Sequence, residues 1–207
     1  LVKTLMGHLY FMERYADNSF KQHLYVMINQ FKPSCIHFDT ILMTQYRQYV
    51  PDQIRTVASI NDSYTLSLKE GIRSSRYSGT QKWYRRWQYV QSRNYESNIY
   101  PEFNAVHVMS YLDAQYLTNL NPSINTVVIP NGVNEELFSL PLPDSSLRNL
   151  IMVADWGGEN LDYLNQFLHA CWKNICNAFP DTKLSIAGRL PENAERLYKL
   201  ISCVNNV

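Results

Sequence analysis

The stretch FNAVHVMSYLDAQYLTNLNPSINTVVIPNG, residues 103–132, decides the fold class. It opens with a short apolar run that ends at Ser110, a residue type that caps helices. Helical spacing follows over 111–119, Asn121-Pro122 breaks it, and 126–129 is a second short run rich in β-branched residues. Two strands joined by one helix are predicted to lie parallel, with the helix covering one face of the sheet.

The same alternation continues toward the amino end of the chain. The predicted elements there are helices over 1–30, with a break and a cap at Asp17-Asn18-Ser19, over 41–49, and from Leu66 to about Ile99 with a break near Ser78-Gly79, and strands over 35–38 and 54–60. Repeated strand–helix–strand units indicate a parallel sheet with helices packed on its faces.

The alternation resumes after a segment of different composition. Residues 139–148 carry two prolines and few large apolar groups, so they are the predicted linker. Strands over 150–154 and 184–188 then alternate with helices over 160–178 and 191–203. The fold class predicted is α/β, with two Rossmann-like parallel-sheet domains that are both incomplete in this chain. The first is 1–138, which lacks its first strand, and 149–207 is the start of the second.

The composition favours a packed globular protein. The hydrophobic fraction is 45%, and the net charge of +1 gives no overall attraction to nucleic acid, which is not an expected partner. None of the four cysteines forms a CxxC pair, so buried free thiols in a reducing compartment are expected. No apolar run is long enough to cross a bilayer, and no secretory signal opens the chain. A cytoplasmic location is predicted, with membrane association left open.

Several segments resemble the family 4 glycosyltransferases of the GT-B fold. They are Arg93-Asn94-Tyr95-Glu96, the strand and cap over 103–113, Val128-Ile129-Pro130-Asn131-Gly132-Val133, and 179–189. The resemblance covers about Ser34 to Leu197. It implies an internal fragment of a bacterial enzyme of exopolysaccharide or lipid-linked glycan synthesis. Such an enzyme transfers a hexose from a nucleotide sugar to a glycan or lipid-linked acceptor, retains anomeric configuration, and needs neither metal nor other cofactor.

Ligands of open parallel sheets bind beyond the carboxyl ends of the strands, and this rule selects the candidate site residues except Arg189, which the resemblance adds. The resemblance then divides them by role. The catalytic candidates are Asn61 and Asp62, the donor-binding candidates are Asp155, Gly157, Gly158, Asn160 and Arg189, and the acceptor-side candidates are Asp39, Ser110, Asn131 and Gly132. Many relatives carry a histidine where this chain has Asn61-Asp62. Asparagine cannot act as an acid or base, which leaves the known mechanism in question.

Each candidate also has a structural interpretation. Asn61, Asp62 and Asn160 are residue types that cap helices, and Ser110 with Asp113 is typical of a cap followed by a first-turn acid. Glu96 is expected to make a structural contact, and His37 to be a packed histidine. Asn131-Gly132 predicts a tight turn, because both residues tolerate positive φ.

The predicted donor loop departs from the family pattern. Relatives often carry an arginine and a lysine there, whereas this loop has Asp155 and Glu159, which would repel a phosphate unless Arg189 compensates. The Glu-x7-Glu element of relatives has no placement, since Glu192 and Glu195 have the wrong spacing. The chain alone is therefore expected to be inactive. Two rivals stay open: a partial domain that binds a glycan or a protein without turnover, and a related fold that isomerises or hydrolyses a nucleotide sugar.

Residues 73–95 are basic and aromatic, with no acidic residue between 72 and 95. On a helix Trp83, Trp87 and Val90 share one face. Three interpretations compete: a helix packed on its domain through tryptophan with a solvated basic side, an interfacial helix in peripheral contact with an anionic membrane, and a nucleic-acid site, which no recognised nucleic-acid motif accompanies.

Overall fold

The computed structural model describes Met12 and residues 15–73, 78–141, 149–157, 159–190 and 194–202. The chain divides into two compact units, Leu1–Val133 and Asn134–Val207. The sequence placed the end of the first domain at 138. Several predicted features lie outside the described residues, namely Gly158, Pro191, Glu192, Cys203, most of the opening helix and most of the linker.

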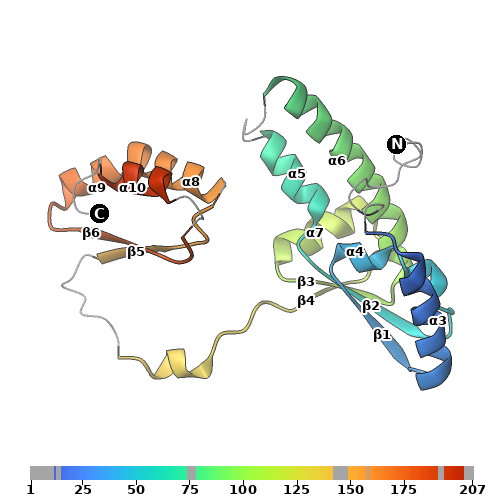
Figure 1. Ribbon diagram of the computed structural model, residues 1–207. Coiled ribbons are helices and arrows are strands. Elements are labelled where there is room, and N and C mark those ends of the chain that lie inside the picture. Colours follow the sequence, from blue (N-terminus) through green and yellow to red (C-terminus); the bar gives the residue numbers. More distant parts are fainter. Residues whose placement is uncertain are drawn as a thin grey trace. The chain divides into compact units, whose positions relative to one another are not determined.

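The first unit contains a four-stranded sheet in the order β1-β2-β3-β4 (Figure 1). The strands are β1 (Cys35–Asp39), β2 (Arg55–Asn61), β3 (Ala105–Val108) and β4 (Thr126–Val128). All three neighbouring pairs are parallel, which confirms the predicted α/β class. Their carboxyl ends form one edge, since Asn61 lies opposite Val108 and Val108 lies opposite Val128.

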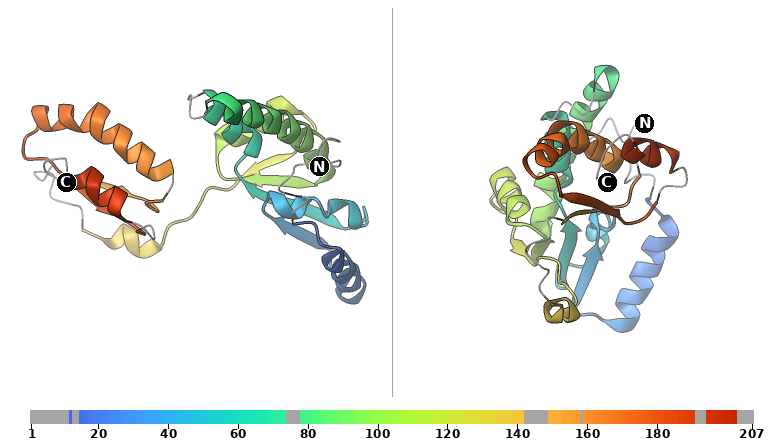
Figure 2. Two further views of the ribbon diagram at one scale, coloured as in Figure 1. Left: turned by 45° about the horizontal axis from the view of Figure 1, so that its top comes forward. Right: turned by 90° about the vertical axis from the view of Figure 1, so that its left-hand side faces the viewer.

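A helix precedes the sheet, and the helices between consecutive strands cover one of its faces. The elements are α3 (Asn18–Phe31), α4 (Ile41–Thr44), α5 (Tyr64–Arg73), α6 (Gly79–Ile99) and α7 (Tyr111–Leu120), with short 3-10 turns at Arg47–Tyr49 and Tyr100–Glu102. Every crossover steps one strand in the same direction, so right-handed connections place α4 to α7 on the same side (Figures 1 and 2). The helix predicted over 41–49 is broken, because Arg47 donates to the carbonyl of Val50 and fixes a tight turn.

Alternation along the strands separates a packed face from a polar one. Phe38, Ala58 and Val106 are buried against the helices. Residues one position away, among them Ser59 and His107, point to the other face and are only partly buried. The core of the first unit therefore lies between the parallel sheet and the helices α4 to α7.

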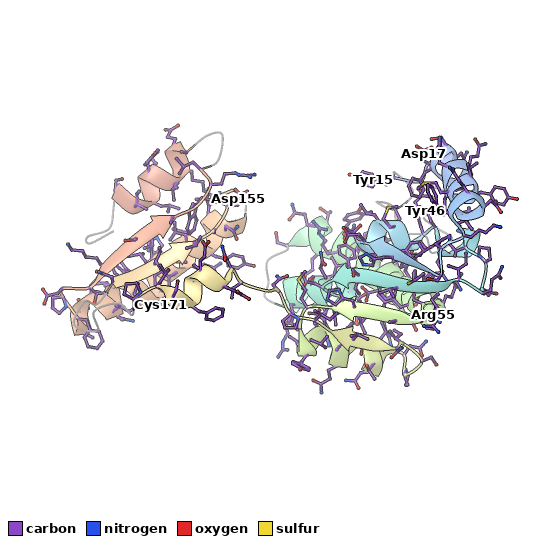
Figure 3. The ribbon with its side chains drawn as sticks, turned by 90° about the horizontal axis from the view of Figure 1, so that it is seen from below. Tyr15, Asp17, Tyr46, Arg55, Asp155 and Cys171 are labelled. Carbon is purple, nitrogen blue, oxygen red and sulfur yellow. The ribbon has the colours of Figure 1, made fainter. Side chains whose placement is uncertain are left out.

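The start of α3 confirms the predicted cap at Asp17. The Asp17 carboxylate accepts from the backbone N–H of Ser19 at 2.7 Å. The hydroxyl of Tyr46 accepts from the Asp17 N–H at 3.0 Å and donates to the carbonyl of Tyr15 at 3.2 Å. Figure 3 shows the three labelled side chains gathered at this end of the helix.

The second unit contains a parallel pair, β5 (Asn149–Val153) and β6 (Lys183–Ala187). Its helices are α8 (Glu159–Phe167), α9 (Lys173–Ala178) and α10 (Glu195–Ser202), with a 3-10 turn at Glu135–Ser139 and a π-helical turn at Leu168–Trp172. Figure 1 shows the three α-helices on one side of the strands. Trp156, Leu164 and Trp172 are buried between them. The helix predicted over 160–178 is thus present, with an unpredicted π-turn at its centre.

The three cysteines in the described residues are not buried thiols. Cys35 and Cys171 are exposed and Cys176 is partly buried, and these three are free. The expectation of burial was wrong for Cys35 because it lies on the polar face of the sheet, and for Cys171 because it lies on the solvent side of the π-turn (Figure 3).

No helix in the described part of the chain combines the length and the apolar character that a membrane span requires.

Candidate functional site

The carboxyl edge of the first sheet has an unusual backbone at two neighbouring strand ends. Thr40, directly after β1, has φ 70° and ψ 156°, and Asn61, the last residue of β2, has φ 63°. Asparagine tolerates positive φ, whereas a β-branched threonine is strained there. Lys32, the other non-glycine residue with positive φ in the described ranges, ends α3 in the ordinary way.

Main-chain hydrogen bonds hold both strand ends in place. The N–H of Thr40 donates to the carbonyl of Ser59 at 2.8 Å, and the N–H of Met109 donates to the carbonyl of Asn61 at 2.9 Å. A β-bulge lies between Ser59 and Asn61. Asp39 and Asp62, one residue before Thr40 and one after Asn61, are exposed. The structure therefore presents both predicted carboxylates at the edge, on backbone that is fixed rather than free.

The helix that follows Asn61-Asp62 is capped by the next residue instead. Ser63 Oγ accepts from the N–H of Leu66 at 3.1 Å, so the capping role predicted for Asn61 or Asp62 belongs to Ser63. Neither candidate side chain is used as the cap, and Asp62 points to solvent. Ser63 itself is completely buried.

Two carboxylates from other helices hold Ser63. Asp113 of α7 accepts from the Ser63 N–H through Oδ1 at 2.9 Å. Glu96 of α6 accepts from the Ser63 hydroxyl through Oε2 at 2.9 Å and from the Thr65 N–H through Oε1 at 3.2 Å. We call Ser63, Glu96 and Asp113 the carboxylate clamp. It fixes the turn that carries Asn61 and Asp62, and it confirms the structural contact predicted for Glu96.

Burial decides the chemistry of the clamp. Glu96 is fully buried, and burial raises the pKa of its carboxyl group, although the hydrogen bonds from Thr65 and Ser63 act in the opposite direction. Hydrogen bonds from the Ser63 hydroxyl and the Thr65 N–H, at the amino end of α5, are what allow a carboxyl group to sit there. No acid or base role is needed to explain it.

Ser110 is engaged in the capping arrangement predicted for it. The N–H of Asp113 donates to Ser110 Oγ at 3.1 Å, and Ser110 Oγ donates to Asp113 Oδ2. This confirms the cap and first-turn acid. Because the Ser110 hydroxyl donates its proton to Asp113, it can only accept a hydrogen bond from an acceptor sugar.

No known family model matches the chain, and no curated protein matches it significantly.

In the second unit the loop after β5 is anchored by Trp156. Its backbone N–H donates to the carbonyl of Arg189 at 2.9 Å, and its indole N–H donates to the carbonyl of Ala187 at 2.7 Å. The carboxylate of Asp155 lies 3.7 Å from the Arg189 guanidinium, and both groups are largely exposed. The structure thus brings together two predicted donor residues, Asp155 (Figure 3) and Arg189, at the end of the parallel pair.

Asn160 and Gly157 complete this loop. The side-chain amide of Asn160 donates to the carbonyl of Asp155 at 2.7 Å, and its N–H donates to the carbonyl of Gly157 at 3.1 Å. Asn160 lies inside the first turn of α8, so the prediction that it caps the helix was wrong. A Cβ at Gly157 would meet nothing closer than 3.8 Å. The loop is therefore open on this side.

The tight turn predicted at Asn131-Gly132 is absent. Both residues are exposed and lie outside any turn, and neither is among the described residues with positive φ. The reason is that the chain leaves the carboxyl edge here without reversing toward the sheet. These two acceptor-side candidates lie at the edge, with no contact that fixes their side chains among those described.

Sequence reasoning missed a hydrogen-bonded row on the polar face of the first sheet. His37 Nε2 lies 2.6 Å from Ser59 Oγ, Ser59 Oγ lies 3.0 Å from His107 Nδ1, and His107 Nε2 lies 2.9 Å from the carbonyl of Ile129. His37 is exposed, so its prediction as a packed histidine was wrong. Alternate positions on adjacent parallel strands were the signal that could have found the row. In the described residues no group of three metal-binding side chains is present.

Proposed function

We propose that this chain is part of a nucleotide-sugar-dependent glycosyltransferase of the GT-B type. It transfers a hexose, with retention and without a metal, to a glycan or lipid-linked acceptor at the cytoplasmic side of the cell. The sequence segments that resemble family 4 support the reaction class. The parallel sheet, shared by many Rossmann-like proteins, is compatible with the GT-B fold.

One observation carries the proposal. Strained or left-handed non-glycine backbone occurs at two neighbouring strand ends, at Thr40 and Asn61, beside the exposed carboxylates of Asp39 and Asp62. Such strain persists only where surrounding structure imposes it, and it concentrates at functional sites. Here the bond from the Thr40 N–H to the Ser59 carbonyl holds the strained residue, and the carboxylate clamp holds the residue directly after Asn61-Asp62. In the proposed enzyme Asp62 accepts a hydrogen bond from a sugar hydroxyl.

The second unit offers the donor chemistry. Its loop from Asp155 to Gly157 precedes α8, and helix amino ends favour phosphate groups. Arg189 is the cation beside the loop, and Asp155 competes for it at 3.7 Å. A diphosphate therefore has to displace Asp155 from Arg189, which predicts weak donor binding.

Titration calorimetry with UDP- and GDP-hexoses tests this proposal. Binding of one of them is expected, about two- to fivefold weaker in Arg189→Gln and about two- to fivefold tighter in Asp155→Asn, as surface charge pairs of this kind allow. Arg196→Gln is the matched control, since Arg196 pairs with Asp162 elsewhere in the same unit. Absence of binding by every nucleotide sugar, or equal effects of all three variants, contradicts the proposal.

The proximity of Asp155 to Arg189 also favours a second candidate, a glycan-binding module without turnover. A module of this kind binds a glycan through the first unit while ignoring nucleotide sugars. Calorimetric titration with the nucleotide sugars separates the two candidates, because the chain binds one of them as part of a transferase and none of them as a module.

A further inference from the structure

Helix α6 carries an outward stripe of apolar and basic side chains. Trp83, Arg86, Trp87, Val90 and Arg93 lie within one arc of the helix, since Arg86, Val90 and Arg93 follow Trp83 by three, seven and ten residues and Trp87 follows it by four. Trp83 is 72% exposed and Val90 is 52% exposed. Arg86 and Arg93 are exposed and Trp87 is partly buried. We call these five residues the α6 stripe.

The opposite face of α6 makes the domain contacts. Ser92 and Glu96 are buried there, and Tyr95 and Ile99 pack against the core of the first unit. The interpretation that the helix packs on its domain through tryptophan was therefore wrong. Helical periodicity correctly grouped Trp83 with Trp87 and Val90, but Trp83 and Val90 are exposed and Trp87 is only partly buried.

The stripe lies on a part of the molecule that stands away from the sheet. Figures 1 and 2 show α5 and the first half of α6 side by side, projecting beyond the other helices. The core cluster of the first unit includes no residue between 79 and 94. From Trp83 to Arg93 the stripe extends about 15 Å along the helix at 1.5 Å per residue.

We infer that the α6 stripe binds the surface of an anionic phospholipid membrane. Indole rings favour the boundary between headgroups and acyl chains, and arginines beside them attract anionic lipid. In the described part of α6 the one acidic residue, Glu96, is buried on the opposite face. The stripe thus combines exposed apolar side chains with two exposed arginines and no acidic residue of α6 on the same face, which suits a lipid surface. The inference does not rest on the transferase proposal.

Aromatic packing within the stripe supports an interfacial role. Tyr84 stacks on Trp87 with ring centroids 5.8 Å apart, which restrains the Trp87 ring. Preformed aromatic surface lowers the entropy lost when the side chains enter the interface. Arg85 does not belong to the stripe, because its guanidinium donates to Gln88 along the side of the helix.

Vesicle flotation of the full chain tests the inference. The protein is expected to float with vesicles of equal parts phosphatidylcholine and phosphatidylglycerol, to float less as salt increases, and to stay behind with phosphatidylcholine alone. Arg86→Gln is expected to weaken the partition about fivefold, since each basic residue near an anionic surface contributes about that factor. Matched controls are Arg55→Gln and Tyr25→Ser, both exposed on other elements, and these keep the wild-type partition.

Tryptophan quenching by brominated lipid gives a second readout. The chain has four tryptophans, and Trp156 and Trp172 are buried in the second unit, so quenching reports Trp83 and Trp87. Trp83→Ser is expected to remove a large share of the quenching while leaving circular dichroism unchanged. Failure to float with anionic vesicles overturns the inference, as does equal loss in the controls. Salt-dependent binding to RNA that anionic vesicles do not compete also overturns it, in favour of a nucleic-acid site.

Discussion

Ser63 Oγ donates a 2.9 Å hydrogen bond to Oε2 of Glu96, and both side chains are completely buried. The bond joins the start of α5 to α6 across 33 residues of sequence. It acts together with the Asp113 carboxylate, which accepts from the Ser63 N–H. Two helices thus hold one serine. Because Asn61 and Asp62 directly precede it, their backbone is held in place as well.

The pH dependence of stability should reveal Glu96. Because burial raises the pKa of Glu96 in the folded chain, the folded state keeps this proton while the unfolded state loses it. The stability that Glu96 contributes is therefore complete below about pH 4.5 and falls as pH rises through the raised pKa. The free energy of unfolding should fall by at most about 1.4 kcal/mol per pH unit.

Urea denaturation of wild type and Glu96→Gln over a pH series measures this contribution. The unfolding free energy of wild type minus that of Glu96→Gln should decrease with rising pH, because only wild type carries the ionisable carboxyl group. Glu70→Gln, on the exposed side of α5, should give a curve parallel to wild type. A wild-type curve parallel to that of Glu96→Gln would falsify the raised pKa.

Removal of the Ser63 hydroxyl should destabilise the first unit. Ser63→Ala leaves Leu66 N–H without its cap and Glu96 Oε2 without its donor. Loss of the cap and of a buried hydrogen bond together should cost about 2–3 kcal/mol. Ser67→Ala, one turn later and exposed, should change the unfolding free energy by less than about 0.5 kcal/mol. Equal effects of the two changes in chemical denaturation would contradict the clamp.

The parallel sheet and its capping residues were predictable because their signals are local. Alternating apolar runs, Asp17 and Ser110 each act within a few residues of their own position. The clamp was not predictable as a unit, because Ser63, Glu96 and Asp113 meet only after three elements have packed. A carboxylate such as Glu96 looks the same in sequence whether it faces solvent or the interior.

The outward direction of the α6 stripe was unpredictable for a related reason. Periodicity identifies residues that share a face, but it does not say whether that face meets a neighbouring element.

Glycine positions show the same limit of local sequence signals. Asn131-Gly132 carries a strong local turn signal and forms no turn, whereas Gly188, with a φ of 126°, is required by the close approach of Ala154, directly after β5.

A side chain at Gly188 should therefore disrupt the second unit. A Cβ there would lie 1.9 Å from the carbonyl oxygen of Ala154, and its φ of 126° is strained for other residues. Gly188→Ala should cost about 3 kcal/mol or more. Trp156 and Trp172 are buried in the folded unit, so the change in their fluorescence reports its unfolding. Gly132→Ala, with nothing within 4 Å of its Cβ, is the control and should leave the transition unchanged. An unchanged transition in Gly188→Ala would refute the close approach.

The row on the polar face of the first sheet fixes the tautomers of two histidines. The carbonyl of Ile129 can only accept, so His107 Nε2 carries the proton and its Nδ1 accepts from Ser59. The Ser59 hydroxyl then has to accept from His37 Nε2. Both imidazoles should therefore be Nε2–H tautomers when neutral.

Long-range proton–nitrogen NMR at about pH 8, where ordinary histidines are neutral, measures these tautomers. His23 is an internal reference of the opposite kind, because its Nδ1 lies 2.8 Å from the carbonyl of Ser19 and must be the donor. In Ser59→Ala, His107 should keep the Nε2–H form through Ile129, whereas His37 should become a mixture. An Nδ1–H tautomer at His107 in the wild type would exclude the hydrogen bond from its Nε2 to the Ile129 carbonyl. The directions inferred for the other bonds of the row would then be wrong.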